Sequence, residues 1–119
     1  MAENLELVMY TRTSGCPFVS LAKKVLKDHD VQYREIFIDK DDTALERVLD
    51  WTGFKAVPTL IIAHEGEDLP MSDPAHLEAG ATPRGIDRGA MITEPGMAVL
   101  TEWLRKHGFI SADNAKDTA

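Results

Sequence analysis

A short apolar run followed by a turn and an amphipathic segment limits what this chain can fold into. Residues 5–11 have strand character, and a serine-glycine turn follows them. Pro17 fits the first position of a helix, because its missing N–H would be unpaired there. The apolar residues after it recur at helical spacing: Val19, Ala22, Val25 and Leu26. We therefore predict a strand, then a helix over residues 16–28, with the only cysteine, Cys16, where they meet.

Cys16 falls at the N-cap of the predicted helix. Unpaired backbone N–H groups and the positive end of the helix dipole lower the pKa of a thiol in such a position. The resulting thiolate is the nucleophile of cysteine chemistry. The alternative is a free cysteine that is buried as a small hydrophobic residue, which is its commonest role. The strand-to-helix turn beside Pro17 favours the reactive thiol.

Composition excludes several classes of protein. The 119 residues, 44% of them hydrophobic, suffice for one globular domain with a modest core. The formal net charge of −7 argues against nucleic acid as a partner. The chain has no apolar run of membrane-spanning length, and its acidic start does not resemble a secretory signal. Because one cysteine cannot form an internal disulfide, we expect a reducing, cytoplasmic location.

The remaining periodicity predicts alternating strands and helices. Residues 32–38 alternate in polarity and complete a strand-helix-strand unit with a parallel crossover. A helix is predicted over residues 43–52, with an acidic turn (39–42) to cap it and Gly53 to end it. Residues 60–63 form a short apolar strand.

The second half of the chain is less regular. Residues 64–88 are polar and rich in glycine and proline, so we predict a long irregular insertion, which is usually functional or mobile. A final strand over 89–92 precedes Thr93, which is predicted to cap the last helix. We predict one domain over residues 1–110 and a disordered tail over 111–119.

Two segments of the chain together carry a family resemblance. Residues 10–12 (Tyr-Thr-Arg) followed by 16–18 (Cys-Pro-Phe) resemble the strand, basic residue and Cys-Pro-aromatic turn of the glutaredoxins. Residues 52–58 (Thr-Gly-Phe-Lys-Ala-Val-Pro) are similar to that family's Thr-Gly-x-x-Thr-Val-Pro. The resemblance covers about residues 5–63 and lapses over 64–92. It implies an α/β thioredoxin-like fold, with a four-stranded mixed sheet flanked by helices.

The resemblance also implies a catalytic turn. Cys16 is its nucleophile, and Pro17 and Phe18 shape the turn. The resemblance assigns Arg12 and Lys55 to the glycine carboxylate of glutathione and to stabilisation of the thiolate. An arginine suits a bidentate contact and a lysine acts as a point charge. Taken as residues alone, both are also consistent with solvated surface cations.

Four further residues are assigned to substrate binding by the resemblance. The proline that matches Pro58 is cis and faces the nucleophile, which leaves the backbone N–H and C=O of Val57 free to pair with a peptide substrate. Without the resemblance, Pro58 is simply a proline at the start of a strand. Thr93 and Glu94 fall where the family holds the γ-glutamyl end of glutathione. Free backbone N–H groups there would bind its carboxylate, and Glu94 would bind its ammonium.

Val19 occupies the position where a second, resolving cysteine would lie, so the turn cannot close an internal disulfide. The mechanism that remains is a monothiol one. In it, the Cys16 thiolate attacks the glutathione sulfur of a glutathionylated protein, and a second glutathione regenerates the enzyme. We therefore predict a monomeric, glutathione-dependent thiol-disulfide oxidoreductase. The family supplies glutathione as the co-substrate, and another low-molecular-weight thiol would serve the same chemistry.

Two other functions remain open. One is an iron–sulfur carrier, in which a glutathione-bridged dimer holds a 2Fe-2S cluster. Such carriers typically have Cys-Gly-Phe-Ser, whereas this chain has Pro17 and Val19 in that motif. The other is a non-catalytic adaptor that uses residues 64–88 as a partner surface. The four histidines lack ligand-like spacing, so no metal site is predicted from side chains. Three charged residues either pair among themselves or reach over the thiol pocket: Arg84, Asp87 and Arg88.

Overall fold

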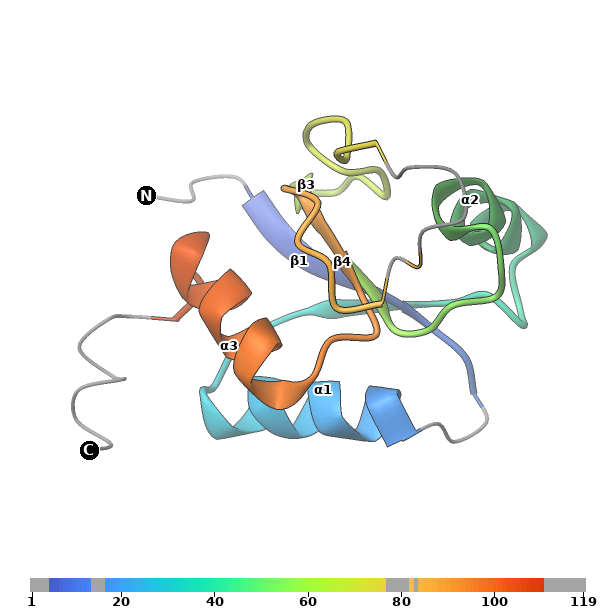
Figure 1. Cartoon of the computed structure of the whole chain (residues 1–119). Coiled ribbons are helices and arrows are strands. Elements are labelled where there is room, and N and C mark those ends of the chain that lie inside the picture. The colour runs from blue at the N-terminus through green and yellow to red at the C-terminus, as the bar shows by residue number, and fades with distance from the viewer. Residues whose placement is uncertain (1–4, 14–16, 77–81, 83, 111–119) are drawn as a thin grey trace.

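The computed structural model describes residues 5–13, 17–76, 82 and 84–110. Along the chain the elements are β1 (Leu5–Thr11), α1 (Pro17–Asp28), β2 (Arg34–Phe37), α2 (Asp42–Thr52), β3 (Thr59–His64), β4 (Met91–Thr93) and α3 (Met97–Lys106). The strands form one sheet in the order β2-β1-β3-β4, with helices on both faces (Figure 1). This arrangement confirms the predicted four-stranded α/β fold.

The sheet is mixed, and its register decides which chain segments meet at its ends. Strand β2 runs parallel to β1, as the crossover through α1 requires, whereas β3 is antiparallel to both β1 and β4. Tyr10 lies opposite Thr59, and Thr59 lies opposite Thr93. The C-terminal ends of β1 and β4 therefore meet the first residue of β3. We call this the Pro58 end of the sheet, because Pro58 directly precedes β3.

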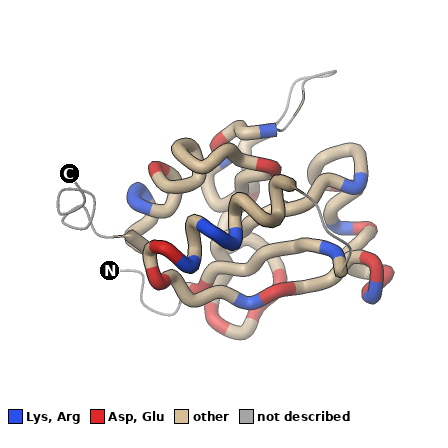
Figure 2. Tube along the Cα trace, turned by 90° about the horizontal axis from the view of Figure 1, so that it is seen from below, with Lys and Arg blue, Asp and Glu red and all other residues tan. Residues whose placement is uncertain are grey.

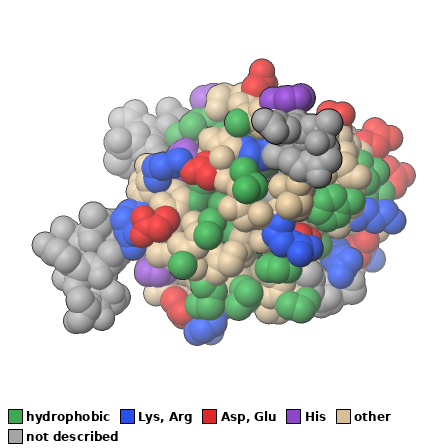
Figure 3. Space-filling model, in the orientation of Figure 1, with side chains coloured by type: hydrophobic (Ala, Val, Ile, Leu, Met, Phe, Trp, Pro, Cys, Tyr) green, Lys and Arg blue, Asp and Glu red, His purple; other side chains and the backbone are tan. Residues whose placement is uncertain are grey.

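The two faces of the sheet bury separate apolar clusters. Leu7 and Met9 of β1 pack on one face with residues of α1 and α3. Val8 and Tyr10 point to the other face, where α2 covers them. Hydrophobic and charged side chains are interspersed on the outer face that carries α3 (Figure 3). None of the helices in the described part of the chain is long and apolar enough to cross a membrane.

Local capping explains why α2 forms where it was predicted. The side chain of Asp41 accepts a hydrogen bond of 3.1 Å from the N–H of Ala44. At the other end Gly53 adopts a left-handed conformation with φ of 86°, and its N–H donates to the C=O of Leu49 at 2.8 Å. The glycine is needed here because residues with a Cβ rarely adopt this conformation. Both ends of this helix are therefore set by short-range chemistry.

The predicted cap of the last helix is wrong. Thr93 is the final residue of β4, and α3 begins at Met97 after Gly96, which makes no side-chain capping bond. Thr93 stays in the sheet because it pairs with Thr59, and the two hydroxyl oxygens lie 3.1 Å apart. Glu94, with φ of 45°, then interrupts the regular backbone. The predicted tail over 111–119 lies outside the described residues.

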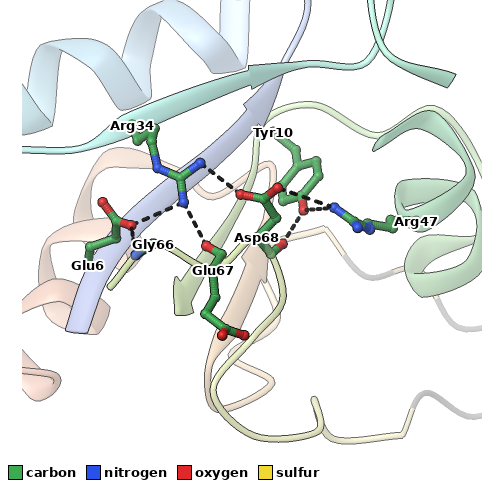
Figure 4. Close-up of polar contacts among 7 residues, drawn as sticks. All are labelled: Glu6, Tyr10, Arg34, Arg47, Gly66, Glu67 and Asp68. Atoms are coloured by element: carbon green, nitrogen blue, oxygen red, sulfur yellow. Dashed lines mark hydrogen bonds and ion pairs between the residues drawn. The ribbon is translucent and has the colours of Figure 1, made fainter. Parts of the chain in front are cut away.

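The connection between β3 and β4 is held to the sheet by a polar network (Figure 4). Arg34 donates to a carboxylate oxygen of Asp68 at 2.8 Å and to one of Glu6 at 3.1 Å. The hydroxyl of Tyr10 donates to the backbone C=O of Asp68, and Arg47 donates to the same hydroxyl at 3.3 Å. The predicted irregular insertion thus contains a well-anchored part. Strand β3 ends at His64. Among the described residues between β3 and β4, the only β-bridge is the isolated one between Arg84 and Thr93.

Candidate active site

The Pro58 end of the sheet gathers the segments that were predicted to form a site. Arg12 follows β1, Pro17 begins α1 and Glu94 follows β4. Cys16 lies outside the described residues, and so its role stays a prediction from the sequence. Of the other two residues of the predicted turn, Pro17 is exposed and Phe18 is half-buried in the first turn of α1.

Arg12 and Lys55 line one pocket. The pocket has a volume of about 260 Å³ and is lined by Arg12, Ile38, Asp39, Leu45 and Lys55. The Nε of Arg12 is buried and has no hydrogen-bond partner among the described residues. Lys55 is exposed. Along the rest of the described backbone, lysine and arginine residues are interspersed with acidic ones (Figure 2).

Asp39 is a member of this pocket that the sequence assigned only to an acidic turn. Its carboxylate accepts a hydrogen bond of 3.1 Å from the backbone N–H of Thr13, and also one from the Thr13 hydroxyl. The bond from the hydroxyl lowers the pKa of Asp39. These bonds tie the segment after β1 to the end of β2, and so they fix the backbone beside Arg12.

The prediction of a cis bond before Pro58 is confirmed. Val57 is 2% exposed and has an interaction partner in the structure. The C=O of Pro58 accepts a hydrogen bond of 2.8 Å from the N–H of Glu94. The hydroxyl of Thr59 donates to the C=O of Ala56 at 2.9 Å. The segment before β3 is therefore bound to the end of β4.

The surroundings of Glu94 differ from those that the sequence predicted. Its N–H is occupied by Pro58, so it is not available to a ligand carboxylate. Its side chain is 10% exposed, and Oε1 accepts a hydrogen bond of 2.7 Å from the Nε of Arg84. The guanidinium of Arg84 also lies over the ring of Phe18, 5.2 Å from the ring centre. Thr93 is fully buried.

The structure distinguishes the three charged residues that the sequence could not assign. Arg84 reaches the predicted site, Asp87 forms an ion pair with Lys106, and Arg88 is buried against backbone carbonyls. No sequence signal separates them, because their partners lie on distant segments. Among the described residues, no group of three or more His, Cys, Asp or Glu side chains is placed to hold a metal ion.

The order of elements, the β2-β1-β3-β4 sheet and the proline before β3 define a thioredoxin-like α/β fold. The family model for glutaredoxin matches residues 7–66, which span half of the chain. The chain therefore belongs to the glutaredoxin family, a class of glutathione-dependent thiol oxidoreductases.

Among solved structures, the chain is similar to a buckwheat glutaredoxin–glutathione complex. It is 19% identical to the chain, covers 92% of it, and is itself covered over 86% of its length, with a TM-score of 0.49. The search of curated proteins found no match.

Proposed function

We propose that this protein reduces mixed disulfides between proteins and glutathione by a monothiol mechanism, with Cys16 as the nucleophile. The observation that carries the mechanism is Val19, three residues after Cys16 on α1. Val19 is apolar, 6% exposed and packed in the core beneath α2. Because the chain has no second cysteine, the thiol that resolves a disulfide on Cys16 must come from the substrate or from glutathione.

The reaction has two balanced thiol–disulfide exchanges. In the first, the Cys16 thiolate attacks the glutathione sulfur of the mixed disulfide. A Cys16–glutathione disulfide forms, the old disulfide breaks, and the protein substrate leaves as a thiolate that takes a proton from water. In the second, the thiolate of free glutathione attacks the glutathione sulfur on Cys16. Glutathione disulfide forms and the Cys16 thiolate is regenerated.

Arg12 supports the binding of an anionic thiol at this site. Arg12 lines an open pocket, where a ligand carboxylate can pair with its positive charge. Lys55 lines the same pocket and adds a second positive charge. The pair therefore suits the glycine carboxylate of glutathione, with Arg12 as the directional contact and Lys55 as the point charge.

The proposal is tested with a peptide–glutathione mixed disulfide and free glutathione. We expect catalytic release of the peptide thiol and a one-to-one Cys16–glutathione adduct by mass spectrometry. R12Q should lower kcat/KM by about tenfold, the effect of one charge-assisted hydrogen bond. K24Q removes the same charge from an exposed α1 residue that pairs with Asp28, and it should leave the rate unchanged. Absence of both turnover and adduct would refute the proposal.

We also propose that the protein is a monomer. It would work in a reducing, cytoplasmic setting, because the second exchange consumes reduced glutathione. Sedimentation of the purified protein tests the monomer. Reconstitution with iron and sulfide tests the alternative function. A dimer with the absorbance of a 2Fe-2S cluster, found together with an absence of turnover, would favour the cluster carrier instead.

A further inference from the structure

The backbone around Arg84 is fixed against the outer edge of β4. Arg84 forms an isolated parallel bridge with Thr93, and the N–H of Gly85 donates to the C=O of Thr93 at 2.7 Å. Strand β4 is the last strand of the sheet on that side. The connection that precedes β4 therefore covers the end of its exposed edge and brings the Cα of Arg84 to the Pro58 end of the sheet.

Two contacts orient the side chain of Arg84. Its Nε donates to Oε1 of Glu94 at 2.7 Å, and the guanidinium lies 5.2 Å from the ring centre of Phe18. The carboxylate of Glu94 is nearly buried, whereas the side chain of Arg84 is 57% exposed. An ordered carboxylate and an aromatic ring thus hold an otherwise accessible guanidinium in one direction.

The terminal nitrogens of Arg84 are not used by these contacts. Only Nε contacts Glu94, and the terminal nitrogens make no hydrogen bond to any residue in the described ranges. Two N–H groups that point the same way match the two oxygens of a carboxylate. Since Phe18 is the second residue after Cys16 in the sequence, these donors lie beside the predicted catalytic turn.

Arg84 and Arg12 lie on opposite sides of β3. Arg12 follows β1 and Arg84 borders β4, and each of these strands is a neighbour of β3. Because Arg84 lies beyond β4, three strand spacings separate the two backbones, which corresponds to about 14 Å. Three extended residues span about 10 Å, and the guanidinium of Arg84 covers the remaining distance because it extends inward from its backbone to Glu94 and Phe18. A tripeptide with a carboxylate at each end, such as glutathione, can therefore place one carboxylate near each arginine.

We propose that Arg84 is a specificity-determining residue that binds the γ-glutamyl carboxylate of the glutathione half of the substrate. Glu94 does not bind the γ-glutamyl ammonium, because its carboxylate is already paired with Arg84. The site consequently selects small thiols by a carboxylate at each end and is indifferent to the ammonium group. This inference rests on the proposed function for the identity of the ligand.

The test measures equilibrium binding, so that it does not depend on turnover. S-methylglutathione is the probe, because its thioether cannot exchange with Cys16. Its γ-glutamyl α-amide removes the carboxylate, and its glutaryl analogue removes only the ammonium. We expect R84Q to weaken binding of the probe by about tenfold, the effect of one charge-assisted hydrogen bond. R84K should retain part of the affinity, and K24Q should retain all of it.

The two analogues identify the contact. The wild-type protein should bind the amide about tenfold more weakly than the probe, and R84Q should bind both equally. The wild-type protein should bind the glutaryl analogue as tightly as the probe. Binding that is unchanged in R84Q, a tenfold loss with the glutaryl analogue, or no binding of the probe would each overturn the inference. Thermal melts establish that R84Q is folded.

The outcomes also separate this inference from the proposed function. Turnover of the peptide–glutathione disulfide with binding that ignores Arg84 would refute the carboxylate contact and leave the monothiol reaction intact. Binding that depends on Arg84 without turnover would refute the reaction and leave a carboxylate site beside the catalytic turn.

Discussion

Arg88 is a buried cation that joins the β3–β4 connection to α2. It is 6% exposed, its Nε donates to the C=O of Ala75 at 2.8 Å, and its Nη1 donates to the C=O of Trp51 at 2.7 Å. Burial lowers the pKa of Arg88. Trp51 is in the last turn of α2, where the helix dipole favours a positive charge. We predict that truncation of Arg88 destabilises the protein far more than truncation of Arg84.

The expected magnitude follows from these two hydrogen bonds. A bond from a charged donor contributes about 1.5–3 kcal/mol, so R88A loses about 3–6 kcal/mol and leaves two carbonyls without a donor. Release of a buried charge offsets part of this loss, because desolvation of a cation is unfavourable. We expect a net loss of about 3 kcal/mol, a large fraction of the 5–15 kcal/mol that is typical of a folded domain. R88K keeps the charge and should lose about half as much.

Urea denaturation measures this difference. With an m value of about 2 kcal/mol/M, a loss of 3 kcal/mol lowers the midpoint by about 1.5 M. R84A is the matched control. The side chain of Arg84 is more than half exposed, so its ion pair with Glu94 contributes about 1 kcal/mol at most. If R88A and R84A unfold at the same midpoint, the carbonyl contacts of Arg88 do not stabilise the fold and the reasoning is refuted.

Three further predictions concern the nucleophile, the loss of stability at acid pH and the core. C16S should abolish turnover and leave the melting temperature almost unchanged; a stability loss of several kcal/mol would instead place Cys16 in the core. The hydrogen bond from Arg34 lowers the pKa of Glu6 below 4.5, so its contribution is present above that pH and is lost as pH falls through the lowered value. The urea midpoint of E6Q should therefore fall less steeply below about pH 4.5 than that of the wild-type protein. An equally steep fall in both proteins would contradict this. W103F removes the bond of 2.9 Å from Trp103 Nε1 to the C=O of Gly89 and should lower the free energy of unfolding by about 2 kcal/mol, measured by urea denaturation.

The parts of the fold that the sequence predicted are those set by short-range chemistry. The ends of α2 follow from Asp41 and Gly53, whose partners lie within four residues. The four strands and the alternation along β1 follow from apolar periodicity, because opposite faces of the sheet bury separate clusters. Arg12 and Lys55, the two basic residues that the family resemblance singled out, line one pocket of the fold.

The errors arise where distant segments decide the local structure. Threonine is a common helix N-cap residue, but the pairing of Thr93 with Thr59 keeps it in the sheet. Arg88 lies in a polar segment that predicts exposure, and yet it is buried. Its acceptors are backbone carbonyls, which every residue carries, so the sequence holds no signal for the contact. The contact of Arg84 with Phe18 depends in the same way on how the connection crosses the edge of β4.

The candidate site is held by the sheet, although the residue proposed to set its specificity comes from the connection. Thr59 and Thr93 are polar residues that are fully buried at the Pro58 end of the sheet. Buried hydroxyls destabilise a fold unless they are hydrogen-bonded. Here the hydroxyl of Thr59 binds the C=O of Ala56 and contacts that of Thr93, which fixes the segment before β3 to the end of β4. Because strand ends position the site, a change in the connection that replaces Arg84 alters which thiol is bound without moving the segments that flank the catalytic turn.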